Sequence, residues 1–156
     1  MTMTDVRTTT TPRHYRDTQV DVKVLLCALW ISMLFVFAYV DIFGFWRADV
    51  INGALAGKVP GAGFKINQSF LVFTTIYILI PSLMVIVSLI APARINRTAN
   101  IVASLTYAAS VVAGVIGETW RYYIVGSVVE VMLLLVVARV AWTWPSRPTP
   151  RTGADV

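Results

Sequence analysis

Long apolar runs with few or no charged residues alternate with polar connections along this chain. Four runs, at about residues 24–45, 68–91, 98–117 and 122–142, each reach the ~20 residues that a helix needs to cross a bilayer core. Hydrocarbon offers no water to backbone N–H and C=O groups, so a membrane span must be a helix or part of a closed barrel. The runs lack the alternation of polar and apolar residues that barrel strands have, which favours helices.

The pattern predicts an all-α membrane protein: an antiparallel up-down bundle of four transmembrane helices within residues 22–144. Pro81, near the middle of the second run, has no backbone N–H. The carbonyl of Tyr77 therefore lacks its helical partner, and a kink is expected there. Asn67 is the expected N-cap of this helix, and Pro92 follows its end.

Polar segments flank and connect the four runs. Residues 1–21 and 145–156 have no apolar periodicity and are expected to be disordered cytoplasmic tails. The longest connection covers residues 46–66, on the extracytoplasmic side. Within it, residues 48–56 place apolar side chains on one side, which suits a short helix in the membrane interface. A poorly ordered loop is an equally good interpretation.

Composition supports lipid as the solvent. The chain is 57% hydrophobic and 13% charged, whereas about a quarter of the residues in soluble domains are charged. A soluble protein this apolar would expose large apolar patches and aggregate. The net charge of +5 comes from tails and short loops, which is typical of topology signals and headgroup contacts. The expected partner is therefore the lipid bilayer, and nucleic acid is not expected.

The basic residues also predict an orientation. An even number of spans places both termini on one side, and nine basic residues lie on that side against four on the other. The positive-inside rule then makes the termini cytoplasmic, in a multi-pass protein of the cell (plasma) membrane.

Three carboxylates and one arginine lie in or beside the spans in the outer half of the predicted bundle. Asp41 lies ~7 Å below Trp46, and Glu130 lies ~12 Å below the start of the last span, at 1.5 Å per residue. Glu118 and Arg121 flank the connection between the last two spans. A charged carboxylate near the bilayer centre costs about 2.5 kcal/mol or more, so such a group faces the interior, pairs or is protonated.

One interpretation is an outward-facing polar cavity lined by Asp41, Glu118 and Glu130, with Arg121 as counter-charge. It would bind a proton, a cation or a small polar ligand, as in a transport-like protein. The alternative is a hydrogen-bond network that only fixes helix packing, as in a non-catalytic accessory or scaffold subunit. Neighbouring candidates for the cavity are Tyr122, Tyr123 and Gly126. The inner half is expected to be apolar.

Small residues recur every four positions in the third span, at Ala109, Ala113 and Gly117. This spacing allows close helix approach, either within the bundle or in a homo-oligomer. In the fourth span, Gly126 precedes Glu130 by four residues and shares its face, so close packing at Gly126 would shield the carboxyl from lipid.

Missing residue types exclude several chemistries. The one histidine, His14, lies in the N-terminal tail, and the one cysteine, Cys27, has no partner for a disulfide. No phosphate-binding loop, dinucleotide fingerprint or Ser/His/Asp set is present. We therefore expect no cofactor, no metal and no enzymatic activity.

Four stretches of the sequence carry a resemblance to a known family. They are residues 41–45 (Asp-Ile-Phe-Gly-Phe), 80–84 (Ile-Pro-Ser-Leu-Met), 92–97 (Pro-Ala-Arg-Ile-Asn-Arg), and 117–123 with its Gly-Glu and Tyr-Tyr pairs. Over about residues 22–144 the chain resembles a family of small bacterial four-helix integral membrane proteins of unknown function. The resemblance implies the fold and supplies no activity, cofactor or partner.

Overall fold

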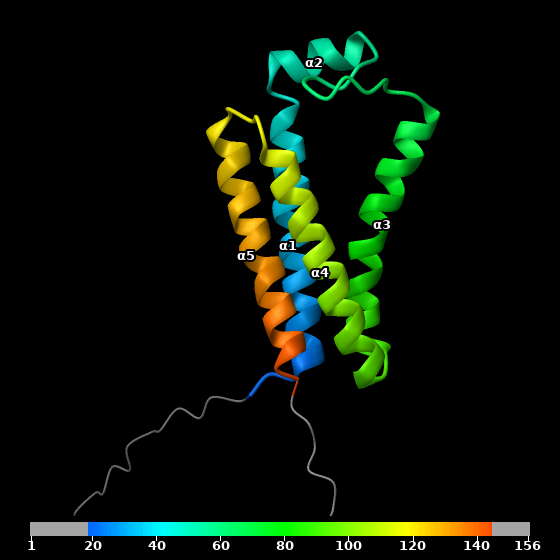
Figure 1. The fold of residues 1–156 in the computed structure, drawn as a ribbon, viewed down its shortest axis with the longest axis vertical. Coiled ribbons are helices and arrows are strands. Elements are labelled where there is room, and N and C mark those ends of the chain that lie inside the picture. The colour runs from blue at the N-terminus through cyan, green and yellow to red at the C-terminus, as the bar shows by residue number, and fades with distance from the viewer. Residues whose placement is uncertain (1–18, 145–156) are drawn as a thin grey trace, which may run out of the picture.

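The computed structural model describes residues 19–144, which fold into helices joined by short links (Figure 1). The helices are α1 (Val22–Gly44), α2 (Ala48–Leu55), α3 (Gln68–Ile90), α4 (Ala93–Val115) and α5 (Arg121–Trp142). All except α2 are long and apolar enough to cross a membrane, which confirms the predicted all-α class with four spans. Residues 1–18 and 145–156, where tails were predicted, lie outside the described residues.

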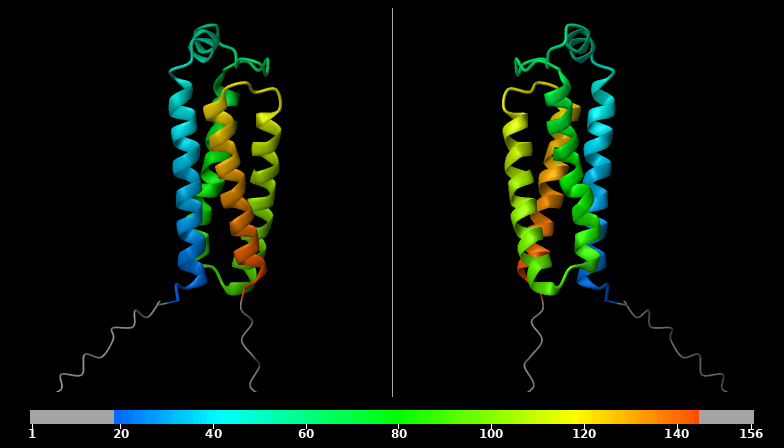
Figure 2. Two further views of the ribbon diagram at one scale, coloured as in Figure 1. Left: turned by 90° about the vertical axis from the view of Figure 1, so that its left-hand side faces the viewer. Right: turned by 90° about the vertical axis from the view of Figure 1, so that its right-hand side faces the viewer.

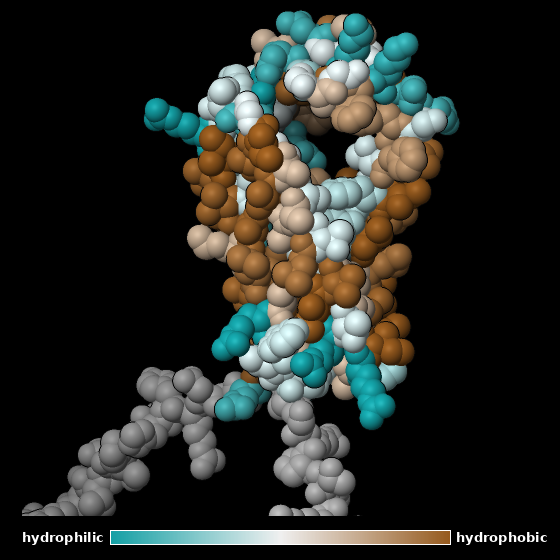
Figure 3. Space-filling view, viewed as in Figure 1, coloured by the Kyte–Doolittle hydropathy of each residue, from teal (hydrophilic) through white to brown (hydrophobic). Residues whose placement is uncertain are grey.

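The four long helices run up and down in sequence (Figures 1 and 2). One end, here called the terminal end, holds the start of α1, the end of α5 and the α3–α4 link. The opposite end, the α2 end, holds α2 and the α4–α5 link. Helix α5 packs against α1 and α4, whereas α3 packs against α1 and meets α4 over a smaller area. Apolar side chains such as Phe35 and Phe73 are exposed on the outside, where lipid would cover them (Figure 3).

Helix α4 begins at Ala93, five residues before the position predicted from hydropathy. Pro92 precedes it as N-cap, a place where the missing N–H costs little. The polar stretch interpreted as a loop is an amphipathic first turn. Asn96 is buried there, while Arg94 and Arg97 are exposed.

The first connection contains α2, so the interpretation of this segment as a short helix is right. Gly57 follows it with a φ of 66°, a left-handed conformation that ends helices and suits glycine. The chain then folds back on itself, because Lys58 and Lys65 form an isolated antiparallel bridge. Beyond this bridge, residues 19–144 contain no β structure.

The half of the molecule near the terminal end was expected to be apolar, and that expectation is wrong. Asn100 Oδ1 accepts hydrogen bonds from Trp30 Nε1 at 2.7 Å and from Ser88 Oγ at 3.2 Å. Asn100 Nδ2 donates to Asn96 Oδ1 at 2.6 Å, and Asn96 Nδ2 donates to the Ser88 carbonyl at 2.6 Å. All four residues are 0% exposed. This Asn100 network therefore joins α1, α3 and α4 where water cannot compete.

The α3 C-terminus has a further tie to α1. Lys23 Nζ donates to the carbonyls of Leu89 at 3.1 Å and Ala91 at 2.9 Å. A cation placed on the last carbonyls of a helix satisfies acceptors that have no partner in the helix and complements its dipole.

Pro81 lies within α3, and the carbonyl that it leaves without a partner is satisfied by another helix. The Tyr107 hydroxyl of α4 donates to the Tyr77 carbonyl at 2.5 Å. The Tyr77 hydroxyl lies 2.6 Å from Ser110 Oγ, which donates to the Tyr107 carbonyl at 2.8 Å. This Tyr77–Tyr107–Ser110 ring of contacts is the last polar tie between α3 and α4 toward the α2 end.

Beyond this ring, α3 diverges from the other helices (Figure 1). Every residue from Leu71 to Ile76 is exposed. The hydroxyls of Thr74 and Thr75 donate to their own helix, at the Phe70 and Leu71 carbonyls. Figure 3 shows the surface deeply hollowed between α3 and α4 beneath α2. The molecule is thus closed toward the terminal end and open toward the α2 end.

Tyr107 donates to the carbonyl that Pro81 leaves without a helical partner, and this predicts that substitutions of Tyr107 and Pro81 are energetically coupled. Tyr107→Phe should lower the free energy of unfolding by about 1 kcal/mol, because the Tyr77 carbonyl loses its only partner. In a Pro81→Ala background the cost should be smaller, since the new backbone N–H at position 81 serves that carbonyl. A double-mutant cycle in detergent micelles measures this coupling. Tyr39→Phe, at an exposed tyrosine, is the control and should change little. Equal costs of Tyr107→Phe in both backgrounds would contradict the assignment.

Candidate functional site

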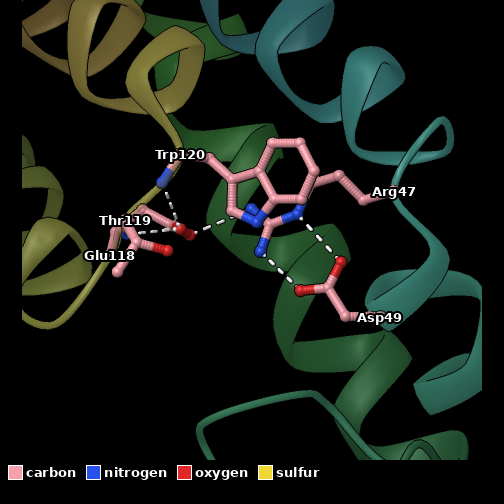
Figure 4. Close-up of polar contacts among 5 residues, drawn as sticks. All are labelled: Arg47, Asp49, Glu118, Thr119 and Trp120. Atoms are coloured by element: carbon pink, nitrogen blue, oxygen red, sulfur yellow. Dashed lines mark hydrogen bonds and ion pairs between the residues drawn. The ribbon is translucent and has the colours of Figure 1, made fainter.

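An ion-pair cluster joins two interhelical links at the α2 end (Figure 4). The Arg47 guanidinium, just after α1, donates from Nη1 to Glu118 Oε2 at 3.0 Å and from Nη2 to Asp49 Oδ2 at 2.6 Å. Glu118 Oε1 accepts from the backbone N–H groups of Thr119 at 2.8 Å and Trp120 at 3.0 Å. The Arg47 guanidinium also lies over the Trp120 ring, 4.7 Å from its centroid. This Arg47 cluster fastens the α1–α2 link to the α4–α5 link.

The cluster perturbs the titration of its members. Partial burial by itself would raise the pKa of Glu118. The hydrogen bonds from Trp120, Arg47 and Thr119 outweigh it and hold the pKa below its ordinary value of 4.5. The hydrogen bond from Arg47 likewise lowers the pKa of Asp49, and the bond to Asp49 raises that of Arg47. All three groups are therefore charged at neutral pH.

Arg121 was the expected counter-charge, and Arg47 takes that role. Arg121 is exposed at the start of α5, and both ion pairs found in residues 19–144 belong to Arg47. Arg47 and Glu118 are separated by 71 positions in sequence, so only the fold brings them together. Glu118 consequently belongs to the rim of the α2 end and is separate from Glu130.

Glu130 lies within α5 and is 2% exposed. Its Oε1 is fully enclosed and has no hydrogen-bond partner within the described part of the chain. One turn earlier, Gly126 packs against α1: a Cβ added there would lie 2.2 Å from Val40 Cγ2. Because Gly126 and Glu130 share a face, the carboxyl points toward α1. Close approach of α1 and α5 thus shields Glu130 from lipid.

Asp41 lies near the end of α1, one turn after Phe37, whose ring contacts the Tyr77 ring of α3. Its neighbour Val40 packs against Gly126 of α5. Because residues four apart share a face of a helix, Asp41 lies on the side of α1 between α3 and α5. It therefore faces the space between these helices, and yet it is exposed. The opening beside α3 accounts for both facts, since it lets solvent reach the interior face of α1. The interior site consists of Asp41 and Glu130.

Tyr122 and Tyr123 serve different parts of the α2 end. Tyr122 makes edge contacts with the rings of Phe43 and Trp120, and lines a pocket of about 370 Å³ beside Arg47. The Tyr123 hydroxyl lies against Gly114 of α4, 3.5 Å from where a Cβ would be. Tyr122 thus belongs to the Arg47 cluster, and Tyr123 to the interior.

Three further observations limit the chemistry. Residues 19–144 contain no group of three or more His, Cys, Asp or Glu side chains that could hold a metal ion. Cys27 is a free, half-buried thiol in α1. The small residues Ala109, Ala113 and Gly117 are all exposed, so no other helix of residues 19–144 covers them. Gly117 follows the end of α4 with a φ of 87°, so it does not continue the helical face of Ala109 and Ala113 as predicted.

A family model described as a family of unknown function (DUF6326) matches residues 16–149. The chain belongs to the DUF6326 family. The match includes all five helices, and it confirms the resemblance to a family without an assigned function. Comparison of this DUF6326 protein with curated proteins and with solved structures finds no match.

Sequence reasoning missed several residues of this DUF6326 protein. Arg47 was counted only as a loop cation, and Tyr77 and Ser110 were not singled out for their hydroxyls. The i, i+4 spacing of Asn96 and Asn100 is a signal that could have shown a buried polar face. It was hidden because the first turn of α4 was interpreted as loop.

The Arg47 cluster predicts how stability depends on pH. Since the folded-state pKa of Glu118 is lowered, its contribution is complete above about pH 4.5 and is lost as the pH falls through the lower folded-state value. Glu118→Gln should remove this part of the loss of folding stability at acid pH. Arg47→Gln should also reduce it and lower the free energy of unfolding at neutral pH by about 1 kcal/mol.

The matched control is Arg121→Gln, which removes the same charge from the other nearby arginine. Unfolding of the four proteins is followed in micelles from pH 3 to pH 8. If Arg121→Gln changes the loss of stability at acid pH as much as Arg47→Gln does, the assigned pairing of Arg47 with Glu118 is wrong.

Proposed function

We propose that this multi-pass membrane protein binds a proton or a small cation at Glu130 and Asp41 and has a transport-like role. The observation that carries the proposal is the enclosed Oε1 of Glu130, which has no hydrogen-bond partner among residues 19–144. An ionised carboxylate left buried without a partner costs roughly several kcal/mol. A proton or a bound cation removes that cost, so the group is suited to take up one or the other.

The chemistry of the site favours a small, hard ligand. Its donors are carboxyl oxygens, which suit protons and alkali cations better than soft metals. The close contact between Gly126 and Val40 leaves no room for a large ligand on the α1 side of Glu130. A proton is the ligand that needs the least space.

The divergence of α3 from the other helices supports a route by which an ion or a proton could reach Glu130. Asp41 is exposed and lies nearer the α2 end than Glu130, so it is the first carboxyl that an ion entering from the hollow meets. Glu130 lies deeper, above the level at which the Asn100 network joins the helices. Uptake from the α2 end and closure toward the terminal end are the features expected of one state of an alternating-access cycle.

The proposal includes an orientation and an absence of catalysis. Nine of the thirteen basic residues belong to the side of the chain termini, which favours cytoplasmic termini and an outward-facing hollow. A proton or cation site of this kind needs no nucleophile or cofactor.

A second candidate is a non-catalytic accessory or scaffold subunit. The satisfied Asn100 network favours it, because such networks fix helix positions without binding anything. The exposed Ala109 and Ala113 of α4, with Gly117 just beyond its end, would then contact another membrane helix, either in a partner or in a second copy. In this case Glu130 would be permanently protonated.

The test is ion flux in proteoliposomes. Vesicles containing a pH-sensitive dye are driven by a potassium diffusion potential, and parallel assays apply sodium and potassium gradients. Glu130→Gln keeps the size of the side chain and removes its titratable proton, so flux should fall at least ten-fold. Asp41→Asn should lower it less, because Asp41 only feeds the deeper site.

Ser127→Ala is the matched control, since Ser127 is also buried on α5 and carries no charge. It should retain flux close to that of the wild type. Thermal melting of each variant checks that the fold is intact. Wild-type flux no higher than in empty vesicles, or unchanged flux in Glu130→Gln, would support the scaffold candidate instead.

A further inference from the structure

Two arginines at the terminal end have no role in the ion site. Arg94 and Arg97 are exposed in the first turns of α4, and neither takes part in an ion pair within residues 19–144. Their neighbour Lys23 is already bound to the α3 carbonyls. Asp21, the acidic residue described at this end, accepts from the Lys23 backbone N–H as the cap of α1. The two arginines therefore present positive charge that nothing in the described chain neutralises.

Both arginines line a shallow groove of about 460 Å³ along α4. Its other lining residues are Thr98, Ile101 and Val102. The groove is amphipathic along its length: the charges lie at the helix start, and the apolar residues lie toward the membrane interior. Arg94 and Val102 are eight positions apart, or ~12 Å along a helix. This order of charge and hydrocarbon matches a phospholipid that stands parallel to α4.

The level and direction of the arginines fit a headgroup. The Arg97 guanidinium lies 5.7 Å from the centroid of the Trp142 ring. Tryptophan rings settle at the boundary between hydrocarbon and headgroups, so this contact places Arg97 at that level. The first turn of α4 also has no side-chain cap, so the positive end of its dipole adds to the attraction for an anion.

We propose that this groove binds one anionic phospholipid, with its phosphate at Arg94 and Arg97 and an acyl chain along Ile101 and Val102. Arginine presents a planar fork of N–H donors that matches phosphate oxygens. A zwitterionic lipid brings its own cation and gains less from the pair. The site is independent of Glu130 and of the proposed ion binding.

Native mass spectrometry of the full chain in a neutral detergent tests this inference. Phosphatidylglycerol and phosphatidylcholine are titrated separately into the delipidated protein, and the affinity of the first bound lipid is compared. We expect tighter binding of phosphatidylglycerol. The double variant Arg94→Gln/Arg97→Gln should weaken it roughly 30-fold, because each cation near an anionic surface contributes about a factor of five. Phosphatidylcholine binding should not change.

Lys58→Gln/Lys65→Gln is the matched control, because it removes the same charge from the α2 end. It should change phosphatidylglycerol affinity less than two-fold. Equal affinity for the two lipids, or equal loss in the two double variants, would overturn the proposal. Displacement of phosphatidylglycerol by an equal concentration of inorganic phosphate would also overturn it, because the acyl part would then contribute nothing. If the arginine double variant fails to fold, the wild type alone still tests the proposal, through its affinities for phosphatidylglycerol and phosphatidylcholine and the competition with inorganic phosphate.

Discussion

The carboxamide of Asn100 joins three of the four spanning helices at a depth where no water can replace it. Its oxygen accepts from Trp30 of α1 and Ser88 of α3, and its nitrogen donates to Asn96 one turn away on α4. In hydrocarbon an unsatisfied polar group is costly, so these groups must find each other for any of them to be buried. Replacing Asn100 would leave donors on two other helices without an acceptor. Asn100 is therefore the side chain that ties α1, α3 and α4 together, whereas Lys23, Asn96 and Tyr107 each join α3 to one neighbouring helix.

The same constraint explains why the other half of α3 is open. Above Tyr77, the helix has no polar contact with its neighbours among residues 19–144, and Thr74 and Thr75 turn their hydroxyls back onto their own backbone. Tyr107 lies at the boundary between the two halves, since its hydroxyl donates to the Tyr77 carbonyl, which Pro81 cannot serve because it has no N–H. Glu130 lies on the open side of the Asn100 network with an enclosed oxygen that has no partner among residues 19–144. The molecule is thus closed where α3 has polar contacts with its neighbours and open where it has none. The Glu130 carboxyl lies toward the open half.

Local physics made much of this predictable from sequence. The spans, the Asn67 cap and the free Tyr77 carbonyl depend on hydropathy, capping and proline geometry, all of which act within a few residues. The spacing of Gly126 and Glu130 likewise showed a shared face. The predictions that were wrong concern features that depend on contacts between distant parts of the chain. Whether Arg47 or Arg121 pairs with Glu118 is decided by where the α1–α2 link lies beside the α4–α5 link. Hydropathy alone assigned the polar start of α4 to a loop, which concealed the network that closes the molecule.

The central claim is that α3 is fixed at one end and open at the other. Pulsed electron spin resonance in nanodiscs measures it, with Cys27 replaced by serine and spin labels at exposed positions of α3 and α4. The pair Leu83 and Val102 lies near the Asn100 network, and the pair Leu71 and Val112 lies toward the α2 end. The first pair should give a narrow distance distribution and the second a longer and broader one, and Asn100→Leu should broaden the first. Equally narrow distributions for both pairs, or no effect of Asn100→Leu, would contradict the account.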